Sequence, residues 1–232
     1  MPKTIIAIIL ILFVTACEPT GKLNSNTQSI QDENNPEVNM SLITAAQQGE
    51  TETVTRLLEQ GADIHAANER GVTALIAAAY QNQVEIAEIL IDAGADVNLQ
   101  DVTQQSAYLI STSDGFLELL QLTLEAGADV TSLDSYNGTG LIRAADRGHV
   151  EIIKELLKTE INIDHINNLG WTALLEAIIL GDGGLRHTEV VRLLVEAGAD
   201  INLADSTGVT PLEHARQRGF EEIVNILEKG NQ

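Results

Sequence analysis

LIDAGAD (residues 90–96) is the stretch that decides the fold, because versions of it return along the chain at a nearly fixed spacing. Close copies end at residues 63, 129 and 200, and a weaker copy, LLKTEIN, ends at residue 162. The intervals between the five ends are therefore 33, 33, 33 and 38 residues. Self-similarity at such a period is the sequence signature of stacked supersecondary units. The sequence thus predicts an array of similar units over most of the chain.

A second motif lies between these copies and supplies the start of a helix. Its forms are GVTALIAAAY from residue 71, NGTGLIRAAD from 137, GWTALLEAII from 170 and GVTPLEHARQ from 208. A hydroxyl residue stands where it can cap each of these helices, and these residues are Thr73, Ser106, Thr139, Thr172 and Thr210. Stretches such as VEIAEILI and TEVVRLLV then carry apolar residues at helical spacing. Each unit is therefore predicted to be two helices joined by a short loop.

The two motifs and the 33-residue period resemble those of ankyrin repeats. The resemblance covers residues 39–230 and implies an all-α solenoid of helix-turn-helix units with tight, hairpin-like β-turn connections. About six repeats, including degenerate caps at both ends, are expected in residues 39–232. A residue with positive φ is wanted after the second helix, and glycine stands there at Gly61, Gly94, Gly127 and Gly198. Glu160 takes this place in the fourth repeat, which predicts strain of about 1 kcal/mol.

Two further departures from the pattern carry expectations. The third repeat has QQSAYL (residues 104–109) where the turn glycine is expected, so we predict a distorted turn. The fifth repeat has five extra residues, 182–186, which are predicted to form a loop between its two helices, after Gly181 and before His187. Insertions in repeat arrays often mark the binding face.

The single cysteine, Cys17, ends an apolar run at residues 4–14 that follows Lys3. A membrane-spanning helix needs about 20 apolar residues, and this shorter run is typical of a secretory signal peptide. VTAC (residues 14–17) resembles the lipobox of bacterial lipoproteins. That resemblance implies cleavage before Cys17, a lipid thioether on its sulfur and fatty acylation, such as palmitate, on its new amine. The alternative is an ordinary signal peptide cut near Ala16, which leaves Cys17 free.

Three segments follow from this interpretation: a lipoprotein signal peptide at 1–16, a flexible tether from Cys17 through residue 38, and the repeat domain at 39–232. The tether is rich in Asn, Ser and Gln and has too few large apolar side chains to form a core. Glu18 is not the aspartate that marks inner-membrane retention in the lipoprotein family. The resemblance therefore favours lipid anchoring to the outer membrane of a bacterium, facing the periplasm.

Composition and motifs argue against nucleic acid binding and catalysis. The formal net charge is −21 and no basic stripe is present, so the chain would repel phosphates. No hydrolase, metalloprotease or phosphate-binding motif occurs. The five histidines lack ligand-like spacing, and GDGG (residues 181–184) lacks the alternating ligands of a calcium loop. No enzymatic activity, cofactor, metal or small-molecule substrate is therefore expected.

The resemblance implies that a protein partner meets the turn tips and the exposed side of the first helices. The predicted partner-binding residues are Tyr80, Tyr136, Arg147, Leu169, Trp171, Ile179, Leu180 and Arg186. Most belong to repeats four and five, and the repeat register predicts that Trp171 is exposed. Aromatic anchors beside arginine favour a binding hot spot. The other interpretation is packing alone, since tryptophan is common after the turn glycine in ankyrin repeats and the inserted residues would cover Ile179 and Leu180.

We therefore expect a membrane-anchored ankyrin-repeat module that mediates protein–protein interaction in the bacterial cell envelope. Its partner would be another protein of the envelope, of unknown identity. The alternative is an accessory protein that inhibits or stabilises one periplasmic enzyme. A stoichiometric change in the activity of a partner enzyme would separate the two.

Overall fold

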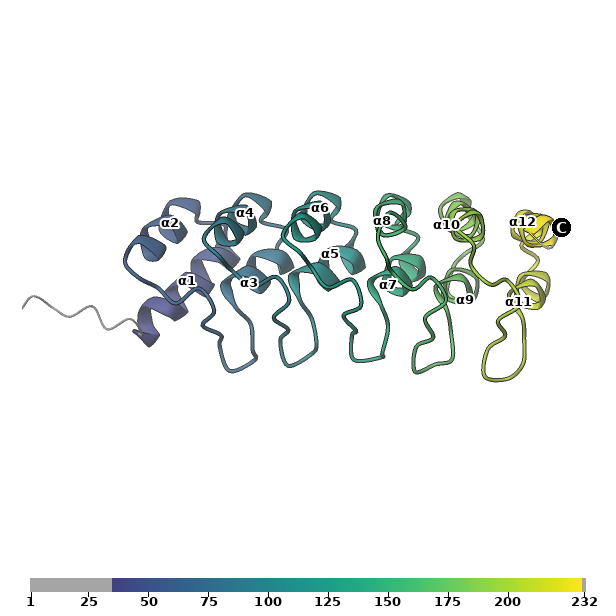
Figure 1. Ribbon diagram of the computed structural model, residues 1–232, viewed down its shortest axis with the longest axis horizontal. Helices are drawn as coiled ribbons and strands as arrows, with labels where there is room; N and C mark the ends of the chain where they lie inside the picture. The colour runs from purple at the N-terminus through teal and green to yellow at the C-terminus, as the bar shows by residue number, and fades with distance from the viewer. Residues whose placement is uncertain (1–34, 231–232) are drawn as a thin grey trace, which may run out of the picture. The chain divides into compact units, whose positions relative to one another are not determined.

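A computed structural model describes residues 35–230, which form twelve helices arranged as six pairs (Figure 1). This part of the chain contains no named strand, only an isolated antiparallel bridge between Ala67 and Thr73. The helices are α1 (Pro36–Gln48), α2 (Thr51–Glu59), α3 (Ala74–Tyr80), α4 (Val84–Asp92), α5 (Ala107–Asp114), α6 (Leu117–Glu125), α7 (Gly140–Arg147), α8 (Val150–Leu156), α9 (Ala173–Ile179), α10 (Leu185–Glu196), α11 (Pro211–Arg218) and α12 (Glu221–Gly230). The predicted all-α solenoid of helix-turn-helix units is confirmed.

The helix pairs of the repeat domain stack in two rows. The first helices of the pairs, α1 to α11 in odd numbers, pack on one another in chain order, and the second helices do the same (Figure 1). The hairpin-like turns between pairs project beyond the row of first helices. Each unit therefore contacts mainly its two neighbours, as in other solenoids.

Local side-chain bonds explain why the first helices begin where they do. The predicted caps are confirmed: Thr73 accepts a hydrogen bond from the backbone N–H of Ile76 at 3.3 Å, and Ser106 accepts one from Leu109 at 3.2 Å. Thr139 and Thr172 cap α7 and α9 in the same way. Thr210 adds a full capping box, since its own N–H donates to the Glu213 carboxylate at 2.8 Å. Each cap satisfies a donor that the helix itself leaves unpaired.

The core divides into two apolar clusters that meet in the third repeat. One cluster runs from α1 to α6 and the other from α5 to α12. Between them α5 buries three hydroxyl residues, Ser111, Thr112 and Ser113. The Ser111 and Thr112 hydroxyls donate to carbonyls of their own helix, at 2.7 and 2.8 Å. The Ser111 and Thr112 hydroxyls are therefore paired at the junction of the two clusters, whereas the buried Tyr108 hydroxyl of the same helix has no partner among the described residues.

The third turn is regular, so the predicted distortion is wrong. Gln104 adopts φ +61°, close to the φ of +74° at Gly71 in the preceding turn. The turn closes with the same two backbone bonds as its neighbours, from Asp101 N to Gln105 O and from Gln104 N to Asp101 O, both 2.9 Å. The Asp101 carboxylate also accepts the N–H groups of Thr103 and Gln105. These bonds hold a glutamine in a conformation that usually favours glycine.

The strain predicted at Glu160 is also absent. Among residues 35–230, the non-glycine residues with positive φ are Asn82, Gln104 and Asn137. The fourth repeat avoids the left-handed conformation because α8 ends early, at Leu156. Two backbone hydrogen bonds between residues three apart follow, from Lys158 N to Glu155 O at 3.1 Å and from Thr159 N to Leu156 O at 3.0 Å. In the other repeats Gly61, Gly94, Gly127 and Gly198 have positive φ as predicted.

The five extra residues form a loop only in part. Leu185 and Arg186 are the first two residues of α10, with Gly184 as the N-cap, so residues 182–184 alone extend the connection. The Asp182 carboxylate accepts the Gly184 N–H at 2.9 Å and lies 2.9 Å from Nδ1 of His187. Nε2 of His187 lies 3.1 Å from the Asp146 carbonyl, which ties the connection to α7. The insertion leaves Leu180 half exposed, so it does not act as the cover for that side chain.

The expected signal peptide, the lipidated Cys17 and most of the tether lie outside the described residues. The last expected tether residues, 36–38, belong to α1. Within residues 35–230, no helix combines the length and apolar character that crossing a bilayer requires.

Candidate protein-binding site

An aspartate or asparagine holds each hairpin-like turn in shape. The Asp134 carboxylate accepts the N–H groups of Tyr136 and Gly138, both at 2.8 Å. In the next turn the side-chain oxygen Oδ1 of Asn167 accepts hydrogen bonds from the N–H groups of Leu169 and Trp171, at 2.9 and 3.0 Å. The two tips are also joined directly, since Asn168 N donates to Tyr136 O at 2.9 Å. Tyr136 and Leu169 are therefore held side by side on rigid turns.

In three of the five turns, the second polar atom of the turn residue bonds to a side chain of the following first helix, nine residues along the chain. Asp134 Oδ2 lies 2.8 Å from Nη1 of Arg143, and Asp205 Oδ2 lies 2.8 Å from Nε2 of His214. In the fifth repeat the donor and the acceptor exchange places, so that the turn residue donates and the helix residue accepts. There the Asn167 amide donates to Oε1 of Glu176 at 2.7 Å. A carboxylate thus stands on α9 where α7 has a guanidinium.

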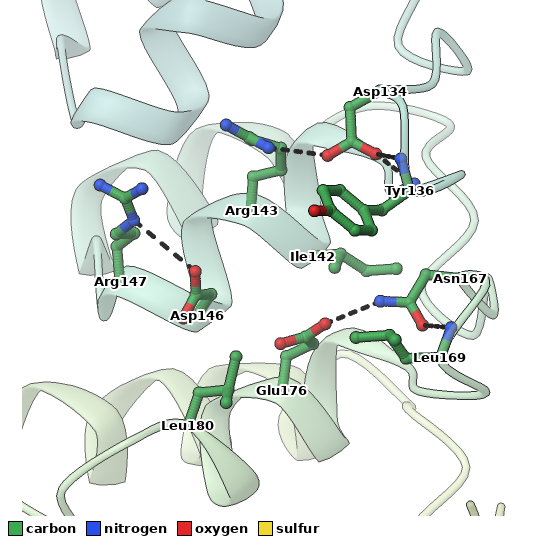
Figure 2. Close-up of a pocket in the computed structure, with 11 residues that line it drawn as sticks. Asp134, Tyr136, Ile142, Arg143, Asp146, Arg147, Asn167, Leu169, Glu176 and Leu180 are labelled. Carbon is green, nitrogen blue, oxygen red and sulfur yellow. Dashed lines mark hydrogen bonds and ion pairs between the residues drawn. The ribbon is translucent and has the colours of Figure 1, made fainter. Parts of the chain in front are cut away.

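A pocket of about 220 Å³ lies between the fourth and fifth repeats (Figure 2). It is formed by the two turn tips and the facing sides of α7 and α9. Figure 2 shows the Asp134–Arg143 pair on one wall and Glu176 with Leu180 on the other. Its lining residues are Asp134, Tyr136, Gly138, Ile142, Arg143, Asp146, Arg147, Asn167, Leu169, Glu176 and Leu180.

Glu176 is the lining carboxyl group that has no cationic partner among the described residues. Its side chain is buried, with 4% of the residue exposed, and Oε2 has no hydrogen-bond partner in this part of the chain. Arg143 instead pairs with Asp134, and Arg147 Nε lies 3.6 Å from Asp146 Oδ2. Burial raises the pKa of Glu176 to about 7, against the lowering effect of the Asn167 hydrogen bond. The nearby charges of Asp146 and Asp134 raise the pKa further.

Glu176→Gln is expected to remove one pH dependence from the free energy of unfolding. Folded Glu176 holds its proton more tightly than the unfolded chain does, so stability falls as pH rises from about 4.5 to 7. The loss is on the order of 2–3 kcal/mol for a shift of this size, and glutamine cannot ionise. Urea unfolding of both proteins at pH 5 and pH 8 measures it. A stability difference between them that is equal at both pH values would contradict the raised pKa.

The structure brings together four of the eight predicted partner-binding residues. Tyr136, Arg147, Leu169 and Leu180 line the pocket. Of these, Tyr136 is 61% exposed, Leu169 is 46% exposed and Leu180 is 50% exposed. Tyr80 lies in a separate groove with Arg70 and Val102, and its hydroxyl donates to Asp101 at 2.7 Å.

The other three predicted residues lie elsewhere. Trp171 and Ile179 are half-buried and do not line the pocket, so the predicted exposure of Trp171 is wrong. Trp171 lies at the base of its turn, where the chain returns to the helices, and Val72 at the same point of the second repeat is buried. Arg186 lies beside Gly148 and His149, away from the pocket.

Sequence reasoning did not find Glu176 and Arg143. The turn residues recur along the sequence near the repeat period, and they are Asn68, Asp101, Asp134, Asn167 and Asp205. The missed signal is the residue nine positions later, which is Arg143 after Asp134, Glu176 after Asn167 and His214 after Asp205. In each pair a donor side chain meets an acceptor.

Residues 35–230 contain no group of three or more His, Cys, Asp or Glu side chains placed so that they could hold a metal ion.

Comparison with known proteins places the chain in a family. The family model for ankyrin repeats (3 copies) matches residues 13–101 and 108–205, which is more than half of the chain. A crystal structure of an ankyrin repeat domain from Acinetobacter baumannii AYE is similar, with a TM-score of 0.80 and 47% identity, and the match covers 82% of this chain and 97% of that one. The ankyrin repeat protein EF0377 is also similar, with a TM-score of 0.79 and 36% identity, over 82% of this chain and 98% of that one.

A curated relative agrees over a shorter stretch. The putative ankyrin repeat protein YahD of Escherichia coli (strain K12) is 57% identical over 53 residues, which are 23% of this chain. The chain thus spans about a quarter of that relative's length, 26%. With the family model and the solved structures, this match shows that the chain belongs to the ankyrin repeat family.

Proposed function

We propose that this chain binds a protein partner through the groove of repeats four and five, meaning the pocket and its rim of Tyr136, Leu169 and Leu180. The observation that carries this proposal is that three exposed apolar side chains surround a preformed pocket. Ankyrin repeats generally mediate binding to other proteins and are typically without enzymatic activity. The groove is therefore the surface through which this chain would bind another protein, as ankyrin repeats generally do.

The groove has the composition and rigidity that favour tight protein binding. Hot spots are enriched in tyrosine and arginine near the centre of an interface, and Tyr136 and Arg147 both line the pocket. The tips that carry Tyr136 and Leu169 are held by their Asx bonds and by the bond between the two turns. A surface that is ordered before binding loses less conformational entropy on association.

Substitution of the rim is expected to abolish partner capture. The full chain, carrying Leu169→Ala with Leu180→Ala, is used beside wild type as bait in a crosslinking pull-down from native cells. Loss of hot-spot side chains costs about 2 kcal/mol or more, which is roughly thirtyfold in affinity. Val102→Ala is the matched control, because Val102 is exposed on the turn of the third repeat. A protein captured equally by wild type and both variants would place the binding surface elsewhere.

We also propose that the module is anchored by lipid on Cys17 in the cell envelope of a bacterium. This rests on the VTAC motif at residues 14–17 and on the short apolar run before it. A multiply acylated cysteine holds a protein at a membrane where a single chain gives only marginal binding. Outer-membrane placement, facing the periplasm, rests on Glu18.

Cys17→Ser is expected to abolish lipid labelling and leave the uncut precursor. Cells are grown with an alkyne-bearing palmitate analogue, and the tagged chain is recovered and probed for the label. Wild type should be labelled and shortened by the signal peptide. An unlabelled wild type, or an equally labelled variant, would contradict lipid attachment at Cys17.

A further inference from the structure

We propose that the pocket between repeats four and five takes a lysine side chain of the protein partner, with the ammonium group bound to Glu176. This inference rests on the proposed function, because it names the side chain that the partner presents to the groove.

The first argument is the unpaired acceptor in the pocket wall. Glu176 lines the pocket, is 4% exposed, and leaves Oε2 without a partner among the described residues. Arg143 is already bonded to Asp134 and to the Ser113 hydroxyl, both at 2.8 Å. A buried polar atom without a partner costs free energy that an entering donor recovers. A cation that reaches Oε2 therefore gains a charge-assisted hydrogen bond.

The second argument is the shape and chemistry of the pocket entrance. Tyr136, Leu169 and Leu180 surround the pocket, and Ile142 lies in its wall. Such surfaces suit the four methylene groups of lysine, which bury against apolar side chains while the ammonium stays with polar groups. The volume of about 220 Å³ exceeds the roughly 150 Å³ cavity that accepts benzene. The pocket is therefore large enough for one extended side chain.

Lysine fits the free acceptor better than arginine does. An ammonium is a compact point charge, whereas a guanidinium presents five donors in a planar fork. The pocket offers one unpaired carboxylate oxygen, and its other carboxylates, those of Asp134 and Asp146, already face arginines. The net charge of −21 also favours a basic partner surface.

Binding of an ammonium is expected to depend on pH in a defined direction. Four other charged groups line the pocket, namely Asp134, Asp146, Arg143 and Arg147. With the pKa of Glu176 raised to about 7, only the ionised fraction binds a cation. That fraction rises about tenfold between pH 6 and pH 8, and lysine stays protonated there because its pKa is about 10.4. The affinity should therefore rise about tenfold over this range.

The test uses Nα-acetyl-lysine N-methylamide as the probe and the full chain labelled with ¹³C at the glutamate carboxyl groups. The Glu176 signal is assigned by its loss in Glu176→Gln. A probe of this size is expected to bind with a Kd on the order of 1–10 mM, to lower the apparent pKa of Glu176 and to bind about tenfold tighter at pH 8 than at pH 6. Nα-acetyl-norleucine N-methylamide, which lacks the charge, should leave the Glu176 signal unchanged.

Three results would overturn the inference. These are no saturating shift of Glu176 at about ten times the expected Kd, equal shifts with the norleucine probe, or stronger binding of the matching glutamate amide, which would indicate an acidic ligand on Arg143. If the lysine probe fails but rim substitutions still abolish partner capture, only the lysine assignment fails. If the probe binds but capture does not depend on the rim, the proposed function fails instead.

Discussion

Replacing Leu141 by alanine is expected to lower the free energy of unfolding by about 2–5 kcal/mol. Leu141 is 0% exposed and belongs to the core cluster that runs from α5 to α12. Its helix, α7, packs against both α5 and α9, so the cavity would open at the centre of the row of first helices. Since repeats are stabilised by their neighbours, a loss at this place weakens the contacts on both sides.

Urea unfolding at an unchanged m-value measures the Leu141→Ala loss. Leu185→Ala is the matched control, because Leu185 is 92% exposed on α10. The control should change stability by no more than about 0.5 kcal/mol. A loss below about 1 kcal/mol for Leu141→Ala, which is less than large-to-small core substitutions give, would contradict the described core.

Gly140→Ala is expected to destabilise the protein by about 1–3 kcal/mol, although alanine is normally the better helix residue. A Cβ at residue 140 would lie 2.6 Å from the Tyr108 hydroxyl oxygen and 2.9 Å from Cγ2 of Thr112. Tyr108 occupies the place that leucine takes in the second and fourth repeats, at Leu75 and Leu141. The larger ring of α5 therefore needs the glycine of α7.

A double-mutant cycle tests this pairing of Tyr108 with Gly140. Tyr108→Leu alone leaves a cavity and costs stability, but it makes room for the new methyl group. The double variant Tyr108→Leu with Gly140→Ala should be more stable than the sum of the two single losses by about 1 kcal/mol or more. Additive losses would show that the tyrosine is not what excludes a side chain at residue 140.

The parts of the fold that could be predicted from the sequence are those fixed by contacts between residues close together in the sequence. The caps at Thr73 and Thr139 need only a hydroxyl and an N–H three residues later, so their positions follow from the repeat period. Gln104 and Glu160 were predicted wrongly for a related reason. Each departs from the repeat pattern, but the backbone nearby adjusts: Gln104 adopts positive φ, and α8 ends early before Glu160.

Four of the eight predicted partner-binding residues lie together at the candidate site, but the buried carboxyl group of that site was not predicted. The repeat register gives the direction of a side chain, so it placed Tyr136, Leu169 and Leu180 on one surface. The register does not give the depth of a side chain at the base of a turn, so it did not predict that Trp171 is half-buried. The carboxyl group of Glu176 was missed because its burial depends on contacts between repeats. Its hydrogen bond to Asn167 becomes evident only when α9 is placed against the turn.

The central claim is that the groove of repeats four and five is where the partner binds, and site-specific photocrosslinking tests it most directly. A photoreactive amino acid is placed at residue 180, beside the pocket, and in a second protein at residue 40, which is exposed on α1. Both full-length proteins are irradiated in native cells. We predict one crosslinked partner from residue 180 and none from residue 40. Crosslinking of the same partner from residue 40 alone, or equally from both, would contradict the claim.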